Sequence, residues 1–284
     1  MKRTLKAALS LFRIRAAEGL QYRVAAFSGA AVSAFWALIE VVVITVFFQY
    51  GHNTGGSING QIHINGLTLS QGISYIWLGQ LMVWLQTPAV DSDLMKKITS
   101  GDIGIELCRP LDFYWHWFAR STAGRISTFI LRGGMVIACG TVLSLIGFRS
   151  IGFGLPFSML NFSLFLLSLF GAFLFSAAYG MFITSIRMGI AWGDGPINMV
   201  VVSGMILAGG YLPLQLWPDF MQDFLRIQPF ASYLDTPARL YTGSVSIENG
   251  LRSILIQFLW IIAFIISGRI IMKRRLRNVV VQGG

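Results

Sequence analysis

The residues that most often carry chemistry are few in this chain, and they are scattered along it. No lysine follows a glycine, so the glycine–lysine pair of a phosphate-binding loop is missing and ATP hydrolysis by that route is not expected. His52 and His63 lie in a polar stretch without nearby cysteines or carboxylates, and no metal site is predicted there. Cys108 and Cys139 are far apart and are interpreted as free thiols. We therefore expect no enzyme activity, metal or cofactor in this chain.

One carboxylate lies within a long apolar run. Gly29, Ser33, Trp36 and Glu40 are spaced four, three and four residues apart and would share one face of a helix. A charge that faces lipid is costly, so this face would point into a helix bundle or a water-filled cavity. Alternatively, Glu40 lies near the outer membrane interface and is hydrated there. The spacing leaves both interpretations open.

The next apolar run carries a second candidate face, which is formed by Trp77, Leu81 and Trp84. Aromatic rings attract organic cations, although a tryptophan in such a run more often packs against protein or anchors a helix at the interface. One hypothesis is a substrate path for an organic cation, lined by Ser33, Trp36, Glu40, Trp77 and Trp84. Asp194 precedes a glycine and a proline, and we interpret it as a helix cap rather than a transport residue.

The elements that must position these residues are membrane helices. The 284 residues are 55% hydrophobic and only 12% charged, whereas a soluble domain is usually about 25% charged. Mean hydropathy is +0.66. The net charge of +10 comes largely from bases at the ends of apolar runs, which is a topology signal and not the basic stripe of a nucleic-acid-binding protein. The chain is predicted to be an all-α integral membrane protein.

Six apolar segments are candidates to cross a hydrocarbon core about 30 Å thick. The second is the weakest because it contains several glutamines, and it is expected to face protein or water more than lipid. The fourth carries a small residue at every fourth position, which is typical of close helix packing. The predicted transmembrane helices of this single domain, 1–284, are residues 24–48, 69–90, 126–146, 157–186, 196–212 and 251–272.

The flanking segments suggest how the chain is oriented. Residues 1–22 are basic and amphipathic, which favours a helix in the cytosolic membrane interface over a simple positive flank. The positive-inside rule makes both termini and residues 91–125 cytosolic, and it makes residues 50–68 an external loop. Residues 213–248 hold several prolines among apolar residues, which indicates broken helices that re-enter the membrane from outside.

Residues 91–125 form the longest charged block between apolar segments. Large apolar residues, among them Leu94, Ile98 and Leu107, are scattered among the charges, and a solvated linker would not need so many. We interpret the block as a docking loop for a partner protein at the membrane surface.

Two stretches resemble a known family. Residues 98–111 read ITSGDIGIELCRPL and are similar to the signature after the second span of ABC transporter permeases of the type-2 export class. The second stretch resembles the motif of that class between spans five and six, through Gly209, Pro213, Pro218, Pro229 and Arg239. The chain is most similar to an uncharacterised bacterial subgroup that often pairs two different permeases. The resemblance covers essentially the whole chain.

The resemblance implies that the first cytosolic loop carries a coupling helix, which seats in a cleft of a separate ATPase. In this sequence the resemblance places that loop roughly from Ser92 to Asp112. The ATPase-coupling residues would be Ile98, Gly101, Asp102, Ile103, Glu106, Leu107 and Arg109. The implied partners are an ABC ATPase dimer, which uses ATP and Mg, and a second permease subunit that is identical or paralogous. A substrate path would lie between the two permeases. The implied location is the bacterial cytoplasmic (inner) membrane.

The expected function is therefore that of a transmembrane permease subunit in an ATP-driven ABC exporter, with ATP hydrolysis in the partner ATPase. The sparse charge within the membrane segments motivates an alternative of a different class, a non-transport membrane scaffold or assembly protein. Co-purification with an ATPase would favour the exporter.

Overall fold

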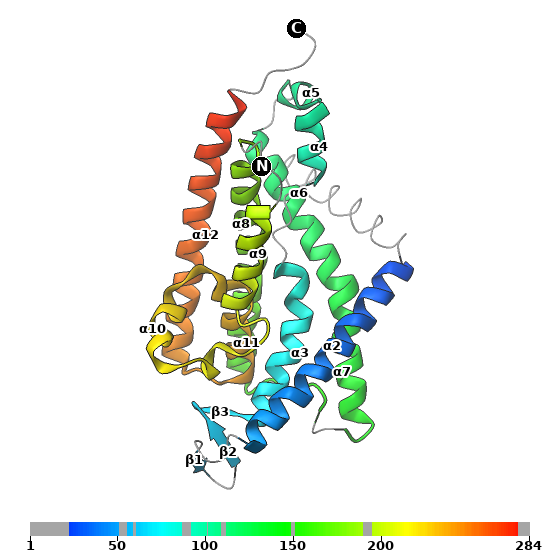
Figure 1. The fold of residues 1–284 in the computed structure, drawn as a ribbon, viewed down its shortest axis with the longest axis vertical. Helices are drawn as coiled ribbons and strands as arrows, with labels where there is room; N and C mark the ends of the chain where they lie inside the picture. Colours follow the sequence, from blue (N-terminus) through cyan, green and yellow to red (C-terminus); the bar gives the residue numbers. More distant parts are fainter. Residues whose placement is uncertain are drawn as a thin grey trace.

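The protein is an elongated bundle of helices in the computed structural model, which describes residues 23–50, 56–58, 61–86, 92–100, 102–108, 112–148, 151–189 and 195–277 (Figure 1). The predicted interfacial helix, residues 1–22, lies outside these ranges, and so does Asp194. Helices α4 and α5 stand at one end of the bundle, and a small β-sheet stands at the other (Figure 1).

Within the described residues, four helical stretches are long and apolar enough to cross a membrane. They are α2 (Arg23–Tyr50), the continuous run of α6 (Phe113–Thr128), η2 (Phe129–Gly133) and α7 (Gly134–Leu145), then α8 (Met159–Arg187) and α12 (Ile247–Leu276). Helix α9 (Gly195–Leu207) is apolar but shorter, and α3 (Leu69–Gln86) has 18 residues. A predominantly helical, multi-pass membrane protein is therefore confirmed, while the number of six spans stays a prediction.

Helix α3 is surrounded by protein. Tyr75, Trp77 and Met82 each expose 1% of their surface or less, and α3 contacts α2, α7, η2, α8 and α11. Its polar side chains find partners within the bundle, as where Gln71 Nε2 donates to the carbonyl oxygen of Thr242 at 3.1 Å. A helix in this position can carry glutamines, because neighbouring helices satisfy them and lipid does not touch them.

Helices α8 and α12 pack along each other. The small residues of α8 are all buried, namely Ser168, Ala172, Ser176, Gly180 and Thr184. From α12, the fully buried Gln257 accepts a hydrogen bond from Ser168 Oγ at 3.1 Å and donates to the carbonyl oxygens of Ser168 and Ser232 at 2.9 and 2.5 Å. Packing by small residues is thus confirmed, and a buried amide fixes where the two helices meet.

Residues 91–125 were predicted to form one loop, but the structure shows helices in this block. It contains α4 (Ser92–Ser100) and α5 (Ile103–Leu107), and α6 then begins at Phe113 and runs without a break into the third predicted span. Asp112 starts α6 as its N-cap, because Oδ1 accepts from the backbone N–H of Trp115 at 3.2 Å. The loop does not extend to residue 125 because aromatic residues after Asp112 are buried against the bundle, among them Trp117 and Phe118. The narrower range that the resemblance implies, Ser92 to Asp112, ends where α6 begins.

The fifth predicted segment is also shorter than 196–212. Helix α9 ends at Leu207, and the chain turns at Gly209, which has a φ of +84°. Four short elements follow, η3 (Leu214–Leu216), α10 (Asp219–Ile227), η4 (Pro229–Tyr233) and α11 (Asp235–Thr242). Figure 1 shows them folded back along the lower half of α12.

The expected external loop contains a three-stranded antiparallel sheet, β1 (Gly56–Ile58), β2 (Gln61–Ile64) and β3 (Leu67–Thr68). Asn65 and Gly66 connect β2 to β3 with φ angles of +50° and +76°. An Asn-Gly pair favours this kind of tight hairpin turn, so the turn could have been predicted from the sequence.

Candidate functional site

The α4–α5 segment, Ser92–Leu107, is the best-defined candidate site, and it lies at the end of the bundle opposite the sheet (Figure 1). Leu94 of α4 is fully buried in the main hydrophobic core, and Ile98 packs partly against that core. Lys96, on another side of α4, is exposed. One face of α4 is therefore attached to the bundle while another remains open.

A buried carboxylate attaches α5 to α6. Glu106 is 8% exposed, and its Oε2 accepts a hydrogen bond from the indole Nε1–H of Trp117 at 3.0 Å. Its Oε1 pairs with the ammonium group of Lys97 on α4. A buried carboxylate needs both a charge partner and hydrogen bonds, and Glu106 has both. This one side chain thereby joins α4, α5 and α6.

Cations gather around the ring of Trp117, which is itself fully buried. The guanidinium of Arg120 lies 4.8 Å from the ring centroid, and Lys97 Nζ lies 5.6 Å from it. Arg120 Nη2 also pairs with Asp93 Oδ2 of α4 at 2.5 Å. Cations at these distances are attracted by the ring face. The α4–α5 segment is consequently held on α6 by charge, hydrogen bonds and ring contacts together.

The seven predicted coupling residues do not share one exposed surface. Ile103 is fully buried and Glu106 nearly so, whereas Leu107 is 44% exposed and Asp102 is exposed. Ile98 is half-buried, and Gly101 and Arg109 lie outside the described residues. The open surface of the segment is instead made by Asp102 and Leu107, together with Lys96, Ser100 and Cys108.

Sequence reasoning missed the residues that hold the segment, namely Asp93, Lys97, Trp117 and Arg120. The two basic residues and Asp93 were visible only as charges. Trp117 stands in the aromatic run that follows Asp112, and burial of that run was the available signal. The pairing itself joins residues up to 27 positions apart, and no sequence spacing predicts it.

Residues that follow this segment connect α6 to other helices of the bundle. Asp112 Oδ2 lies 2.7 Å from Arg269 Nη2 on α12. Further along α6, Arg125 Nη1 donates to Ser176 Oγ on α8 at 2.7 Å, and that hydroxyl donates to the carbonyl oxygen of Leu85 on α3 at 2.5 Å. A displacement of α6 would therefore act on three other helices.

The predicted substrate-path residues fall into different environments. Glu40 Oε1 accepts from Gln80 Nε2 of α3 at 3.0 Å, so its side chain points into the bundle. Ser33 is buried, and Trp36 is 52% exposed on the outside of α2. These three residues do not line one open cavity in the single chain.

The two tryptophans of α3 have partners of their own. Trp77 is fully buried, and its indole donates to the carbonyl oxygen of Ile151 at 2.9 Å. The ring of Trp84 is covered by the guanidinium of Arg132, 4.5 Å from the centroid. Because Arg132 already occupies this ring face, Trp84 is a poor site for a cationic substrate.

The residues of the second motif lie in the compact group of short elements that precedes α12. Pro213, Pro218 and Pro229 stand at the beginnings of η3, α10 and η4, where a proline is tolerated because the first helical N–H groups lack intrahelical partners. Gly209 is required at its turn, because a Cβ there would lie 2.3 Å from the hydroxyl of Tyr75.

Arg239 completes this motif by pairing with a buried carboxylate. Its Nη1 lies 3.6 Å from Asp235 Oδ2, and Asp235 Oδ1 accepts from the hydroxyl of Tyr75 at 3.0 Å. Asp235 and Tyr75 were not predicted, although the four-residue spacing from Asp235 to Arg239 is typical of a helical ion pair. The contact ties α11 to α3.

No metal site is found in the described ranges, where no group of three or more histidine, cysteine or acidic side chains could hold an ion. Residues 34–283 match the family model described as ABC-2 family transporter protein. No curated protein matches the chain significantly.

Proposed function

Since the chain belongs to the ABC-2 transporter family, as a multi-pass membrane subunit that is not itself an ATPase, we propose that it is the permease of an ATP-driven exporter. ATP and Mg would bind to a separate ABC ATPase dimer, and the α4–α5 segment would dock on that dimer. The distribution of bases supports cytosolic termini. The location that follows is the bacterial cytoplasmic membrane.

One observation carries this proposal: the α4–α5 segment is fixed on its inner side and open on its outer side. Glu106 and Trp117 hold the inner side. Leu107 exposes 44% of its surface at the tip, beside the exposed Asp102 and Cys108. An exposed leucine among polar residues is suited to insertion into a cleft of a partner, since burying its side chain there removes apolar surface from water.

The same contacts provide a route for motion. When two ATPases close around ATP, a docked α4–α5 segment would move with them. The Glu106 contacts would pass that displacement to α6, and α6 continues through η2 into α7 beside α2 and α3. The Asp112–Arg269 pair would carry the motion to α12. Rigid elements of this kind transmit displacement because packed interfaces do not deform continuously.

A second permease would complete the substrate path. Helices α2 and α9 carry many large apolar side chains with little cover from the rest of the chain, such as Phe35 (63% exposed) and Met199 (76%). Trp36 is 52% exposed on this side of α2, whereas Glu40 points inward to Gln80. If the substrate is an organic cation, Trp36 is the better candidate, because Trp77, Trp84 and Glu40 are already engaged.

The coupling role is tested by Leu107→Arg in the assembled transporter. A bulky charge at the tip should weaken binding of the ATPase at least tenfold, equivalent to about 1.4 kcal/mol, and should abolish substrate-stimulated ATP hydrolysis. Binding is measured by co-purification over a range of ATPase concentrations, and hydrolysis is measured in proteoliposomes.

Leu155→Arg is the matched control for this experiment. Leu155 is 93% exposed in the connection between α7 and α8, at the other end of the molecule, so the same exchange there should leave both readouts unchanged. Normal ATPase binding by Leu107→Arg would rule out docking through the tip. Binding without any transport by the parent protein would favour the scaffold alternative.

A further inference from the structure

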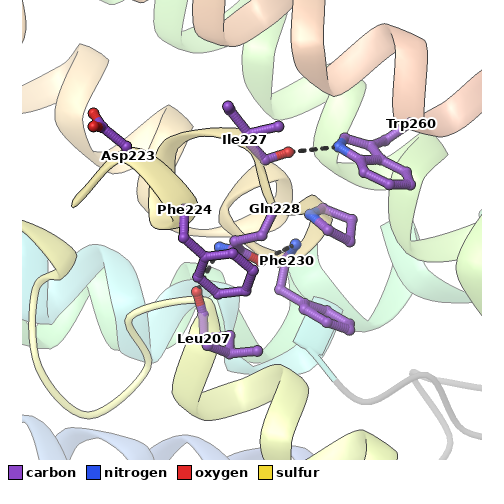
Figure 2. Close-up of a pocket in the computed structure, with 8 residues that line it drawn as sticks. Leu207, Asp223, Phe224, Ile227, Gln228, Phe230 and Trp260 are labelled. Atoms are coloured by element: carbon purple, nitrogen blue, oxygen red, sulfur yellow. Dashed lines mark hydrogen bonds between the residues drawn. The ribbon is translucent and has the colours of Figure 1, made fainter. Parts of the chain in front are cut away.

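A cavity of about 470 Å³ lies where α10 and η4 meet the end of α9 and the middle of α12 (Figure 2). This volume is within the range of small-ligand pockets. Its walls are almost entirely apolar. The apolar side chains that line it belong to Leu207, Phe224, Ile227, Pro229, Phe230 and Trp260. Asp223 stands at the rim with its carboxylate pointing away from Phe224 and Leu207 (Figure 2).

The polar groups around the cavity are satisfied by one another. Gln228 Nε2 donates to the carbonyl oxygen of Leu207 at 2.8 Å, and Trp260 Nε1 donates to the carbonyl oxygen of Ile227 at 2.8 Å. Figure 2 shows both bonds beside the cavity. These groups are therefore not directed at an occupant. The chemistry of the walls suits a hydrocarbon and not a polar or charged ligand.

The position of Trp260 on α12 gives the depth of the cavity. Between Arg252 and Arg269, α12 has no charged residue. Trp260 is eight positions after Arg252, which corresponds to about 12 Å along the helix axis. In a hydrocarbon core about 30 Å thick, this places the wall that Trp260 forms within the acyl-chain region, while the charged face of α10, with Asp223 and Arg226, must point away from lipid.

The cavity opens onto an exposed apolar surface. Phe224 and Ile227 at its rim are 56% and 59% exposed, and the neighbouring face of α12 exposes Leu255, Leu259 and Ile262. Helix α10 separates its exposed side chains by type. Its apolar stripe is Phe220, Phe224 and Ile227, whereas Asp219, Asp223 and Arg226 lie on a different face. The opening is thus continuous with an apolar surface of the kind that lipid covers.

We propose that this cavity binds the terminal part of a phospholipid acyl chain, which enters from the lipid beside α12. The acyl chain fills the space between α10, η4 and α12, and it stabilises α10 and η4 against α12. This role requires only the membrane position of α12. It does not depend on coupling to an ATPase, so the two proposals can fail separately.

The test uses the assembled transporter in lipid nanodiscs that contain a trace of a photoreactive phospholipid. One probe carries a diazirine near the end of its acyl chain, and a second carries it near the ester carbonyl. After irradiation, peptide mass spectrometry locates the adducts. The chain-end probe should label peptides containing Leu207, Phe224 or Phe230 several-fold more than the exposed α12 stripe, whereas the ester-proximal probe should not.

Two variants fill the cavity, and a third variant serves as the control. Leu207→Trp fills it from α9, and Phe224→Trp, at the exposed rim, does so with little risk to folding. Either should reduce labelling of the remaining cavity peptides several-fold. Leu166→Trp, on the exposed side of α8, should not. Equal labelling of the cavity and the α12 stripe, or no loss in the filled variants, would overturn the proposal in favour of non-specific lipid contact.

Discussion

At the scale of the residue, Glu106 shows how a side chain within a predicted docking stretch can point away from the surface. The sequence marks this residue within a docking stretch, and contact with a partner is the natural expectation. The structure turns its carboxylate inward, onto Trp117 and Lys97. A surface contact by this side chain would require it to leave a buried ion pair, which is strongly unfavourable. Glu106 therefore positions the α4–α5 segment, and Leu107 is the better candidate for contact.

This role predicts the effect of Trp117→Phe. The variant keeps an aromatic ring but removes the N–H that donates to Glu106 at 3.0 Å. Losing a hydrogen bond to a buried charge should cost about 1.5–3 kcal/mol of local stability. Hydrogen exchange in α4 and α5 should accelerate by about ten- to a hundredfold as a result, and substrate-stimulated ATP hydrolysis should fall.

Trp115→Phe is the matched control, because Trp115 lies two residues away and is 44% exposed. It should exchange like the parent. Unchanged protection of α5 in Trp117→Phe would show that the Glu106 contact does not hold the segment.

At the scale of the element, the five-residue π-helix η2 separates two helices with different neighbours. Helix α6 before it packs on α8, and α7 after it packs on α2 and α3. A π-turn accommodates one extra residue and so changes the phase of the helix that follows. In this phase Arg132 covers Trp84, and Gly133 packs against Leu81. A Cβ added at Gly133 would lie 2.4 Å from the Leu81 side chain, so the contact needs a glycine. The irregular turn therefore matches two packing surfaces that a regular helix would misalign.

Inserting one alanine after Ile130 should exceed what a single π-turn absorbs and rotate α7 by about 100° relative to α6. The ATPase should still bind to α4–α5, but substrate-stimulated hydrolysis should be lost. Ile130→Ala keeps the chain length at a position that is 57% exposed, and it should behave like the parent. Full activity after the insertion would show that the phase of α7 is unimportant.

At the scale of the whole molecule, the chain leaves much apolar surface on α2 and α9, and lipid or a second permease must cover it. A permease pair would place part of the α2 surface between subunits. Phe35 is 63% exposed on α2, while Leu166 on α8 is 48% exposed. Cross-linking at these two positions distinguishes a second permease from lipid as the neighbour of α2.

With Cys108 and Cys139 changed to serine, Phe35→Cys should form a covalent dimer, or an adduct with a paralogous permease, when a short bifunctional thiol reagent is added to membranes. Leu166→Cys should not, because we expect α8 to face lipid at that point. Gel mobility and mass spectrometry identify the products. Efficient cross-linking at Leu166 without any at Phe35 would contradict the proposed pairing through α2.

The amino-acid sequence by itself determined the class of this protein, because hydropathy and charge must follow the bilayer. Apolar runs are needed wherever helices meet lipid, and bases are more frequent in cytoplasmic loops than in translocated ones. The small residues of α8 also revealed close packing, since only small side chains allow helix axes to approach. The Ile98–Leu111 and Gly209–Arg239 stretches were recognisable for a related reason, since their local turns and caps restrict which residues fit.

Only the tertiary structure decided which side chains of those stretches point outward. Ile103 and Leu107 are both apolar residues of α5, yet one is fully buried and the other is 44% exposed. The early start of α6, the covering of Trp84 by Arg132 and the cavity beside Trp260 have the same origin. Each depends on contacts between residues far apart in the chain, and these contacts are fixed by how the helices pack rather than by local spacing.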